Sequence, residues 1–434
     1  MRQIITDGKV EKEFLAEIRS REVESDRKVT VQVLDIIENV RKKGDEALKE
    51  YGLAFDKVFP ESLEVPREVL KEAWDNADEK LRSALEFAKD QIEKYHSMQV
   101  QEGCCLEREG LITGQKIRGL KRVGLYVPGG RAAYPSTVLM NAIPAKLAGV
   151  GELLMVTPPL IEKKEDGTLI CRANPDIMAA AYLCGVDRVF LTGGAQAVAA
   201  LAYGTETIPA VDKIVGPGNI YVATAKKLVF GKVDIDMVAG PSEILIIADK
   251  TANPAYVAAD LLSQAEHDPL AASILLTTDP ELPAAVLAEI ERQMSYLGRK
   301  ETIQASLDNN GAILLCKSEE EMVELADSIA PEHLELLTED PVKLLDSIEN
   351  AGSVFCGPYA PEPLGDYCGG PNHVLPTSGT ARYASPLGVY SFIKRMSYTI
   401  ADKAGLDRCR STVLELAERE GLGAHGNAIR VRFE

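Results

Sequence analysis

Four of the five histidines of this chain lie in its C-terminal half, each in a short polar segment beside a carboxylate, a glycine or a proline. They are His267, His333, His373 and His425. Imidazole is the commonest neutral metal ligand and the side chain most readily tuned for proton transfer near neutral pH. In a chain with so few histidines, this concentration predicts one shared site. The alternative is four unrelated surface histidines.

One group of residues has the spacing and chemistry of a metal site. Gln264 and His267 are three residues apart in an expected helix over 260–267, so their side chains share one face and could bind one ion. Asp366 lies in a Pro/Gly-rich loop, and His425 follows a glycine-rich turn. Two imidazoles, one carboxylate and one amide oxygen suit Zn²⁺ or Mn²⁺. Because a structural zinc more often uses cysteine, this set indicates a catalytic or substrate-binding metal.

A second group is suited to moving protons. Glu332 and His333 are adjacent, so they cannot both be ligands on one helix face. The carboxylate could activate water and the imidazole could shuttle a proton. The alternative is a solvated Glu-His pair near the start of a helix or strand.

Three glycine-rich turns follow expected strands, at 126–130, 192–196 and 216–219. Such turns let backbone N–H groups approach a ligand, and the helix start that follows favours anions. None matches GxGxxG, and tight strand-to-helix turns need glycine in any case. Three turns at the carboxyl ends of neighbouring strands nevertheless favour a ligand site, because ligands bind there in open α/β sheets.

The elements that must position these residues change character along the chain. Residues 1 to about 100 are acidic and helical in pattern, as in 31–51 and 66–96, and we expect His96 on a polar helix surface. From Lys121 onward, short apolar strands alternate with helices, which predicts βαβ units around parallel sheets. The expected strands are 123–127, 152–157, 188–192, 213–215, 244–248, 273–277, 312–316, 335–338 and 353–356, and the expected helices between the first of them are 136–149, 176–184, 194–203 and 219–230. The tail is expected to hold a helix, 409–421, and an extended end, 428–433.

Composition restricts the class of protein. A length of 434 residues suggests two or three domains. The net charge of −18, without a basic patch, argues against nucleic acid and anionic membranes as partners. Eight cysteines without CxxC pairs, no secretory signal and no apolar run of ~20 residues predict a cytoplasmic protein.

Several runs of sequence resemble histidinol dehydrogenases. The runs are GPGN (216–219), AGPSE (239–243), SQAEHDP (263–269), APEHLE (330–335) and GPNHVLPTSGTAR (370–382), in the family's order. The resemblance extends from about residue 25 to the C-terminus. It implies an α/β fold of two incomplete Rossmann-like domains with parallel sheets, plus small N- and C-terminal segments. The implied divisions are an N-terminal helical segment (1–25), a larger α/β domain (26–125 with 242–385), an NAD-binding domain (126–241) and a C-terminal dimerisation tail (386–434).

The resemblance also assigns roles to residues. It implies zinc ligation by Gln264, His267, Asp366 and His425, which are the residues grouped above from their chemistry. It makes Glu332 and His333 the catalytic acid/base pair. It implies NAD contacts by Tyr126, Gln196 and Asn219, and substrate contacts by Ser242, His373 and Glu420, together with His333 and the four zinc ligands.

The activity implied by the resemblance is oxidation of L-histidinol to L-histidine through bound L-histidinaldehyde, with two NAD⁺ and one Zn²⁺ per subunit, as the last steps of histidine biosynthesis. The family forms homodimers, so Glu420 and His425 would act in the other subunit's site. A relative acting on another primary alcohol is one alternative, although Ser242 and His373 match the histidinol enzyme. A zinc hydrolase and a non-catalytic, zinc-stabilised binding protein are the others; the first leaves the three turns unexplained and the second leaves the Glu-His pair without a task.

Overall fold

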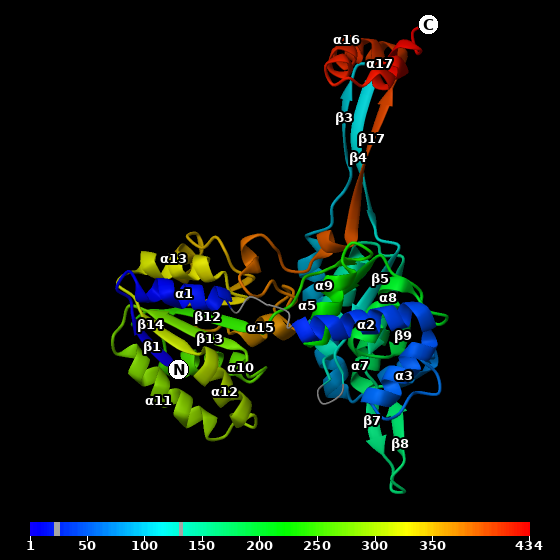
Figure 1. The fold of residues 1–434 in the computed structure, drawn as a ribbon. Helices are drawn as coiled ribbons and strands as arrows, with labels where there is room; N and C mark the ends of the chain where they lie inside the picture. The colour runs from blue at the N-terminus through cyan, green and yellow to red at the C-terminus, as the bar shows by residue number, and fades with distance from the viewer. Residues whose placement is uncertain (21–26, 130–132) are drawn as a thin grey trace.

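The computed structural model describes residues 1–20, 27–129 and 133–434. Two six-stranded sheets form the cores of two α/β units, and an arm projects from one of them (Figure 1). The first sheet is wholly parallel, and the second is parallel except for one edge strand. The predicted α/β class with parallel sheets is confirmed.

The first sheet is buried on both faces. Its strand order is β1 (Arg2–Ile5), β14 (Ala312–Leu315), β13 (Ala272–Thr277), β12 (Glu243–Ala248), β15 (His333–Leu337) and β16 (Ser353–Cys356). One face packs on α10 (Pro254–Ala265), α11 (Leu282–Met294) and α12 (Lys300–Asn310), and the other on α1 (Val10–Ser20), α13 (Glu319–Ile329) and α14 (Pro341–Leu345). Alternate residues of β12 serve the two cores, which is why this strand is an almost continuous apolar run.

The second sheet has the order β11 (Asp234–Ile235), β10 (Lys213–Val215), β5 (Arg122–Tyr126), β6 (Glu152–Thr157), β9 (Arg188–Leu191) and β2 (Glu64–Val65). One face carries α2 (Arg27–Lys43), α3 (Asp45–Phe55), α8 (Gly194–Tyr203) and α9 (Ile220–Val229). The other carries α4 (Arg67–Asn76), α5 (Glu79–Ser97), α6 (Pro135–Leu147) and α7 (Pro175–Leu183). A hairpin of β7 (Leu160–Lys163) and β8 (Leu169–Arg172) projects from this unit (Figure 1).

The packing groups the N-terminal third differently from the expected divisions. Residues 27–97, expected with 242–385, lie on the second sheet, because the apolar stripe of α2 is buried against α8 and α9. Val33 and Leu48, for example, share a core with Val198. Residues 1–20, expected to be a helical segment, also supply β1 as an edge strand of the first sheet.

His96 was expected on the surface, and that prediction is wrong. The side chain is fully buried, with Nδ1 2.9 Å from Gln99 Oε1 and Nε2 3.4 Å from Asn372 Nδ2. Asn372 also donates to the Met140 carbonyl on α6 at 2.6 Å. A loop from the far end of the chain therefore covers a helix face that is polar in sequence.

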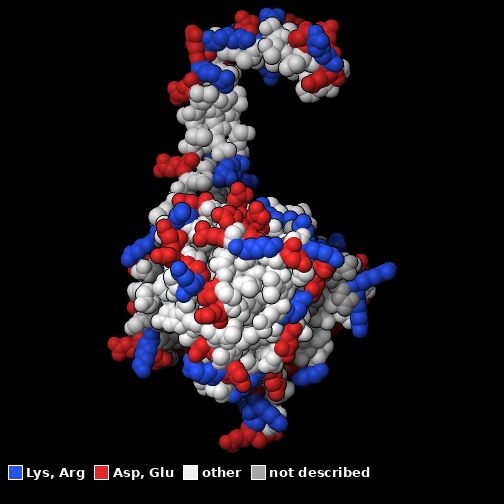
Figure 2. Space-filling model, turned by 90° about the vertical axis from the view of Figure 1, so that its left-hand side faces the viewer, with Lys and Arg blue, Asp and Glu red and all other residues white. Residues whose placement is uncertain are grey.

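The arm is a three-stranded antiparallel sheet that ends in two helices. Strands β3 (Cys104–Arg108), β4 (Leu111–Gly119) and β17 (Ile393–Ala401) form its shaft, and α16 (Lys403–Arg419) and α17 (Gly423–Arg430) form its tip (Figure 1). The expected extended end at 428–433 is wrong for its first residues, which complete α17 packed against α16. The shaft shows few charges between a charged base and a charged tip (Figure 2) and exposes Leu106, Met396 and Ile400.

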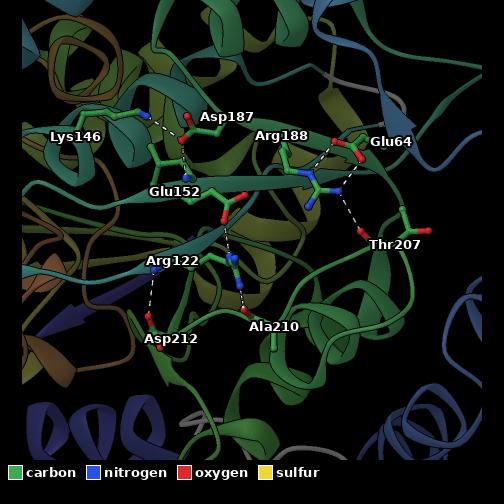
Figure 3. A network of polar contacts seen from close by, with 10 residues as sticks. Glu64, Arg122, Lys146, Glu152, Asp187, Arg188, Thr207, Ala210 and Asp212 are labelled. Atoms are coloured by element: carbon green, nitrogen blue, oxygen red, sulfur yellow. Dashed lines mark hydrogen bonds and ion pairs between the residues drawn. The ribbon is translucent and has the colours of Figure 1, made fainter.

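Ion pairs fasten the amino ends of the strands in the second sheet (Figure 3). Arg122 and Arg188, the first residues of β5 and β9, bind Glu152 at 2.6 Å and Glu64 at 2.6 and 2.7 Å. The Asp187 carboxylate accepts from Lys146 at 2.9 Å and from the Leu153 N–H at 2.8 Å. The charged side chains at the amino ends of these strands bind other residues of the same unit. The glycine-rich turns follow the opposite, carboxyl ends.

Among the helices that the structure describes, none is both long and apolar enough to cross a lipid bilayer.

Candidate active site

The second sheet presents the carboxyl ends of its strands to the expected site, and the first sheet presents the amino ends of its strands. In the second sheet, Tyr126 ends β5, and the turns at 192–196 and 216–219 follow β9 and β10 at their carboxyl ends. In the first sheet, Glu243 and His333 begin the neighbouring strands β12 and β15 at their amino ends. Helix α15 (Glu362–Tyr367) lies between the two units (Figure 1). Each unit therefore carries expected site residues at one end of its strands, whereas Glu420 and His425 lie apart from both, on the arm.

The backbone of one residue, Glu243, contacts both members of the predicted acid/base pair. The Glu243 N–H donates to Glu332 Oε2 at 2.9 Å, and His333 Nδ1 lies 3.0 Å from the Glu243 carbonyl oxygen. Because a carbonyl can only accept, the His333 proton is on Nδ1 and Nε2 is the free lone pair. Nδ1 and Glu332 Oε2 are 3.6 Å apart, and both side chains are buried.

Burial sets the protonation of this pair. Loss of water contact raises the pKa of Glu332 well above its usual value and lowers the pKa of His333 to about 4. His333 is therefore neutral at pH 7 and can accept a proton at Nε2. A carboxyl group with a raised pKa is a stronger base once ionised, which suits Glu332 to general base catalysis.

Additional carboxyl groups, which the sequence did not point to, lie behind this pair. Glu362 Oε1 is 3.6 Å from His333 Nε2, and Glu335 Oε1 accepts from the Glu362 N–H at 2.8 Å. Burial raises the pKa of Glu362 to about 9 and the pKa of Asp260 to about 6, and it raises that of Glu335 as well. Glu335 and Glu362 each retain a buried oxygen without a partner among the described residues. A usable signal was present, because Glu335 lies two residues after His333 and so shares its face of an apolar strand.

The expected metal ligands of the main body fit a bound cation. Gln264, in the last turn of α10, is fully buried, and neither its Oε1 nor its Nε2 has a partner in the described part of the chain. His267 is exposed just beyond that helix, and Asp366 lies in α15. Ligand atoms of His333, Glu362 and Asp366 lie within 4.8 Å of one another, which is compatible with a metal at this point. Of the expected ligands this cluster contains only Asp366, and Glu362 and His333 are its other members. The buried Gln264 amide, with two polar atoms that have no hydrogen-bond partner among the described residues, has the chemistry of a metal ligand.

The other expected substrate residues divide into two groups. His373 Nδ1 lies 3.1 Å from the Asp366 carbonyl oxygen, and burial lowers the pKa of His373. Ser242 directly precedes Glu243 and β12. Glu420 and His425 are exposed at the tip of the arm, so this chain does not bring them to α15 (Figure 1).

The three turns expected to bind NAD meet around Tyr126. The Gly194 N–H, at the start of α8, donates to Tyr126 Oη at 3.0 Å, and a Cβ on Gly216 would lie 2.0 Å from the Tyr126 carbonyl oxygen. Burial raises the pKa of Tyr126 to about 12, so its hydroxyl is neutral and can donate. Gln196 is buried in the first turn of α8. Asn219 caps α9, with Oδ1 accepting from the N–H groups of residues 221 and 222 at 3.1 and 3.2 Å.

The chain combines two α/β units built on parallel strands with a buried Glu-His pair and glycine-rich turns at strand ends. This combination is typical of an enzyme that moves protons beside a ligand site. Comparison with known proteins gives the family. A model of the histidinol dehydrogenase family matches residues 19–433. The chain is 52% identical over 434 residues to the histidinol dehydrogenase of Clostridium acetobutylicum, covering 100% of this chain and 99% of that protein. It is 53% identical over 402 residues to that of Aquifex aeolicus, covering 92% and 91%.

A solved structure agrees. The crystal structure of histidinol dehydrogenase from Elizabethkingia anophelis superposes with a TM-score of 0.91 at 38% identity, covering 100% of this chain and 98% of that one. The chain therefore belongs to the histidinol dehydrogenase family. It is an oxidoreductase.

Proposed function

We propose that the protein oxidises L-histidinol to L-histidine in two steps through bound L-histidinaldehyde, with reduction of two NAD⁺, as a cytoplasmic enzyme of histidine biosynthesis. The observation that carries the proposal is the backbone of Glu243, whose N–H contacts Glu332 and whose carbonyl contacts His333 where the neighbouring strands β12 and β15 begin. Family membership supports the reaction.

The two side chains have different tasks in this proposal. Each oxidation releases a proton from oxygen, and the free Nε2 of His333 is the acceptor in both steps. The aldehyde must add water before it can lose a second hydride. Glu332 accepts the proton of that water, because its buried carboxylate is the more basic for being desolvated. The backbone N–H of Glu243 holds Glu332 in place, and its carbonyl holds His333.

The residues of the site have the chemistry to hold Zn²⁺ and NAD⁺. Gln264, His267 and Asp366, with the partner subunit's His425, would hold Zn²⁺, which would bind and orient the substrate. The orphaned amide of Gln264 is the observation that favours a metal here. Tyr126, Gln196 and Asn219 would contact NAD⁺, which would accept the hydride. Ser242, His373 and the partner's Glu420 would contact the substrate.

We further propose a homodimer in which each arm completes the other subunit's site. Glu420 and His425 lie at the tip of the arm, while Asp366 and Gln264 lie in the main body (Figure 1). The shaft exposes apolar side chains along a thin sheet, and an isolated sheet of this kind is stabilised when a partner covers it (Figure 2).

The test is the stoichiometry of the reaction. Purified, zinc-loaded protein with L-histidinol and NAD⁺ is expected to form two NADH for each L-histidine, measured by absorbance and by amino-acid analysis. Faster turnover of another amino alcohol would favour a relative with a different substrate. Turnover without NAD⁺, together with no NAD⁺ binding, would favour a hydrolase.

A further inference from the structure

A buried ion pair lies beneath the turn at 216–219. Lys226 is on α9, and Asp236 directly follows β11. Their side chains form an ion pair and are only 2% and 1% exposed, respectively. Neither residue has a role in the reaction described above, so the pair needs a separate account.

The pair binds both polar groups of the residue that opens the turn. Lys226 Nζ donates to the Gly216 carbonyl at 2.9 Å, and the Gly216 N–H donates to Asp236 Oδ2 at 2.7 Å. Gly216 has φ of 115°, and a Cβ there would collide with the Tyr126 carbonyl oxygen. The backbone of Gly216 is therefore held on both of its polar groups by the two charged side chains, and the close Tyr126 carbonyl leaves no room for a side chain at this position.

The same pair reaches toward the acid/base residues. Asp236 Oδ1 accepts from the Met237 N–H at 2.7 Å, at the start of the segment that crosses to the first sheet. Along that segment the Gly240 N–H donates to Thr377 Oγ1 at 2.7 Å. The segment ends at Glu243, whose backbone N–H contacts Glu332 and whose carbonyl contacts His333. One short stretch of chain, 236–243, thus joins the turn to the catalytic pair.

Stability alone is a poor explanation for such a pair. Removing two charges from water costs much of what their attraction returns, and apolar replacements are often as stable. Charge-assisted hydrogen bonds are, however, short and strongly oriented. We infer that Lys226 and Asp236 are positioning residues that fix the Gly216–Asn219 turn for NAD⁺ and keep it in register with Glu332 and His333. This inference rests on the proposed binding of NAD⁺ at the three turns.

The chain offers a second Lys-Asp pair as a control, which is less buried than the first because Asp234 is 53% exposed. Lys213, 8% exposed, pairs with Asp234 at 2.8 Å and also joins β10 to β11, but it does so at the amino end of β10, away from the turn. The test compares the variant Lys226→Met/Asp236→Asn with the control Lys213→Met/Asp234→Asn. Each is assayed for NAD⁺ affinity by calorimetry, for the KM values of NAD⁺ and L-histidinol, and for thermal unfolding.

We expect the Lys226/Asp236 variant to raise the KM and Kd for NAD⁺ about tenfold or more, since hydrogen bonds to charged groups contribute on that scale. The KM for L-histidinol should change less than about twofold, as should every constant of the control. Lys226→Gln/Asp236→Asn keeps the side-chain volumes close and leaves no unpaired buried charge, so it should show a smaller rise in the same constant if the first variant does not fold.

Three results would overturn the inference. One is a folded Lys226→Met/Asp236→Asn variant, or a folded Lys226→Gln/Asp236→Asn variant, that binds NAD⁺ as the wild type does. Another is an equal loss of NAD⁺ affinity in the control, which would indicate general destabilisation. Failure of the wild-type protein to bind NAD⁺ would contradict the proposed function itself, and the inference with it.

Discussion

Mixing two inactive variants tests whether the arm completes a second subunit's site. Glu332→Gln removes the general base in the main body, yet the glutamine has the same shape and its Oε1 can still accept from the Glu243 N–H. His425→Ala removes the expected zinc ligand at the arm tip, where the side chain is exposed and its loss should not unfold the protein. Each variant alone has no intact site.

The expected magnitude follows from where the two residues lie. If the arm enters the partner's site, a mixed dimer has one site with both substitutions and one with neither. Random association makes about half of the dimers mixed, so about a quarter of the wild-type activity should return. Each parent should retain only about 1% or less, since a general base contributes ~10²–10⁴-fold.

The assay is NADH formation by co-expressed, differently tagged chains. The unfractionated mixture should show about a quarter of the wild-type activity, and the mixed dimer isolated on both tags, with one intact site of two, should show about half. Glu332→Gln combined with His267→Ala is the control, because both residues belong to the same chain's body and every site of that mixed dimer is defective. The reasoning is refuted if the mixture with His425→Ala is no more active than the mixture with His267→Ala although mixed dimers are present.

The remaining predictions concern the division of labour, the metal and pH. Glu332→Gln should leave alcohol oxidation largely intact and slow the aldehyde step by ~10²–10⁴-fold in single-turnover NADH assays from histidinol and from histidinaldehyde; equal slowing of both steps would contradict the assignment. Chelation should abolish activity and Zn²⁺ should restore it, whereas full activity in verified metal-free protein would exclude the metal site. Burial raises the pKa of Glu243 from 4.5 to about 7, so the folded protein holds an extra proton within that range and loses stability as pH rises through it. Between about pH 5 and about pH 8, the free energy of unfolding in urea should therefore fall further in the wild type than in Glu243→Gln, by an amount on the order of 3 kcal/mol, and parallel profiles would contradict this.

The sequence predicted best the strands that are buried on both faces. β6 and β12 are apolar runs that a single-sequence pattern reveals, and their bounds agree with expectation to within a residue. The arm could not be predicted in this way, because β4 is of mixed composition and only partly buried, and its partner β17 lies far along the chain, with Ile393 opposite Gly119. β2 has only two residues and exists through its pairing with β9.

Some residues of the candidate site could be predicted from the sequence, and others could not. Histidines and turn glycines stood out because each is rare or conformationally special in this chain. Glu362 did not, because one carboxylate among 66 acidic residues carries no pattern until folding buries it. Glu335 was missed although its position two residues after His333 in an apolar strand was a signal. His96 was misread because the Asn372 loop that covers it lies in a distant part of the chain.

The opposed orientation of the two sheets has a consequence for electric charge. Helices that follow strands of the second sheet, α8 and α9, begin at the shared region, whereas α10 of the first sheet ends there. A helix start carries roughly half a positive elementary charge and a helix end roughly half a negative one. The helix ends therefore favour an anion on one side and a cation on the other, which suits the phosphates of the proposed NAD⁺ and the proposed metal ion. Two units in the same orientation would have presented helix ends of one sign, and a protein of net charge −18 would then have had to separate an anion from a cation with side chains alone.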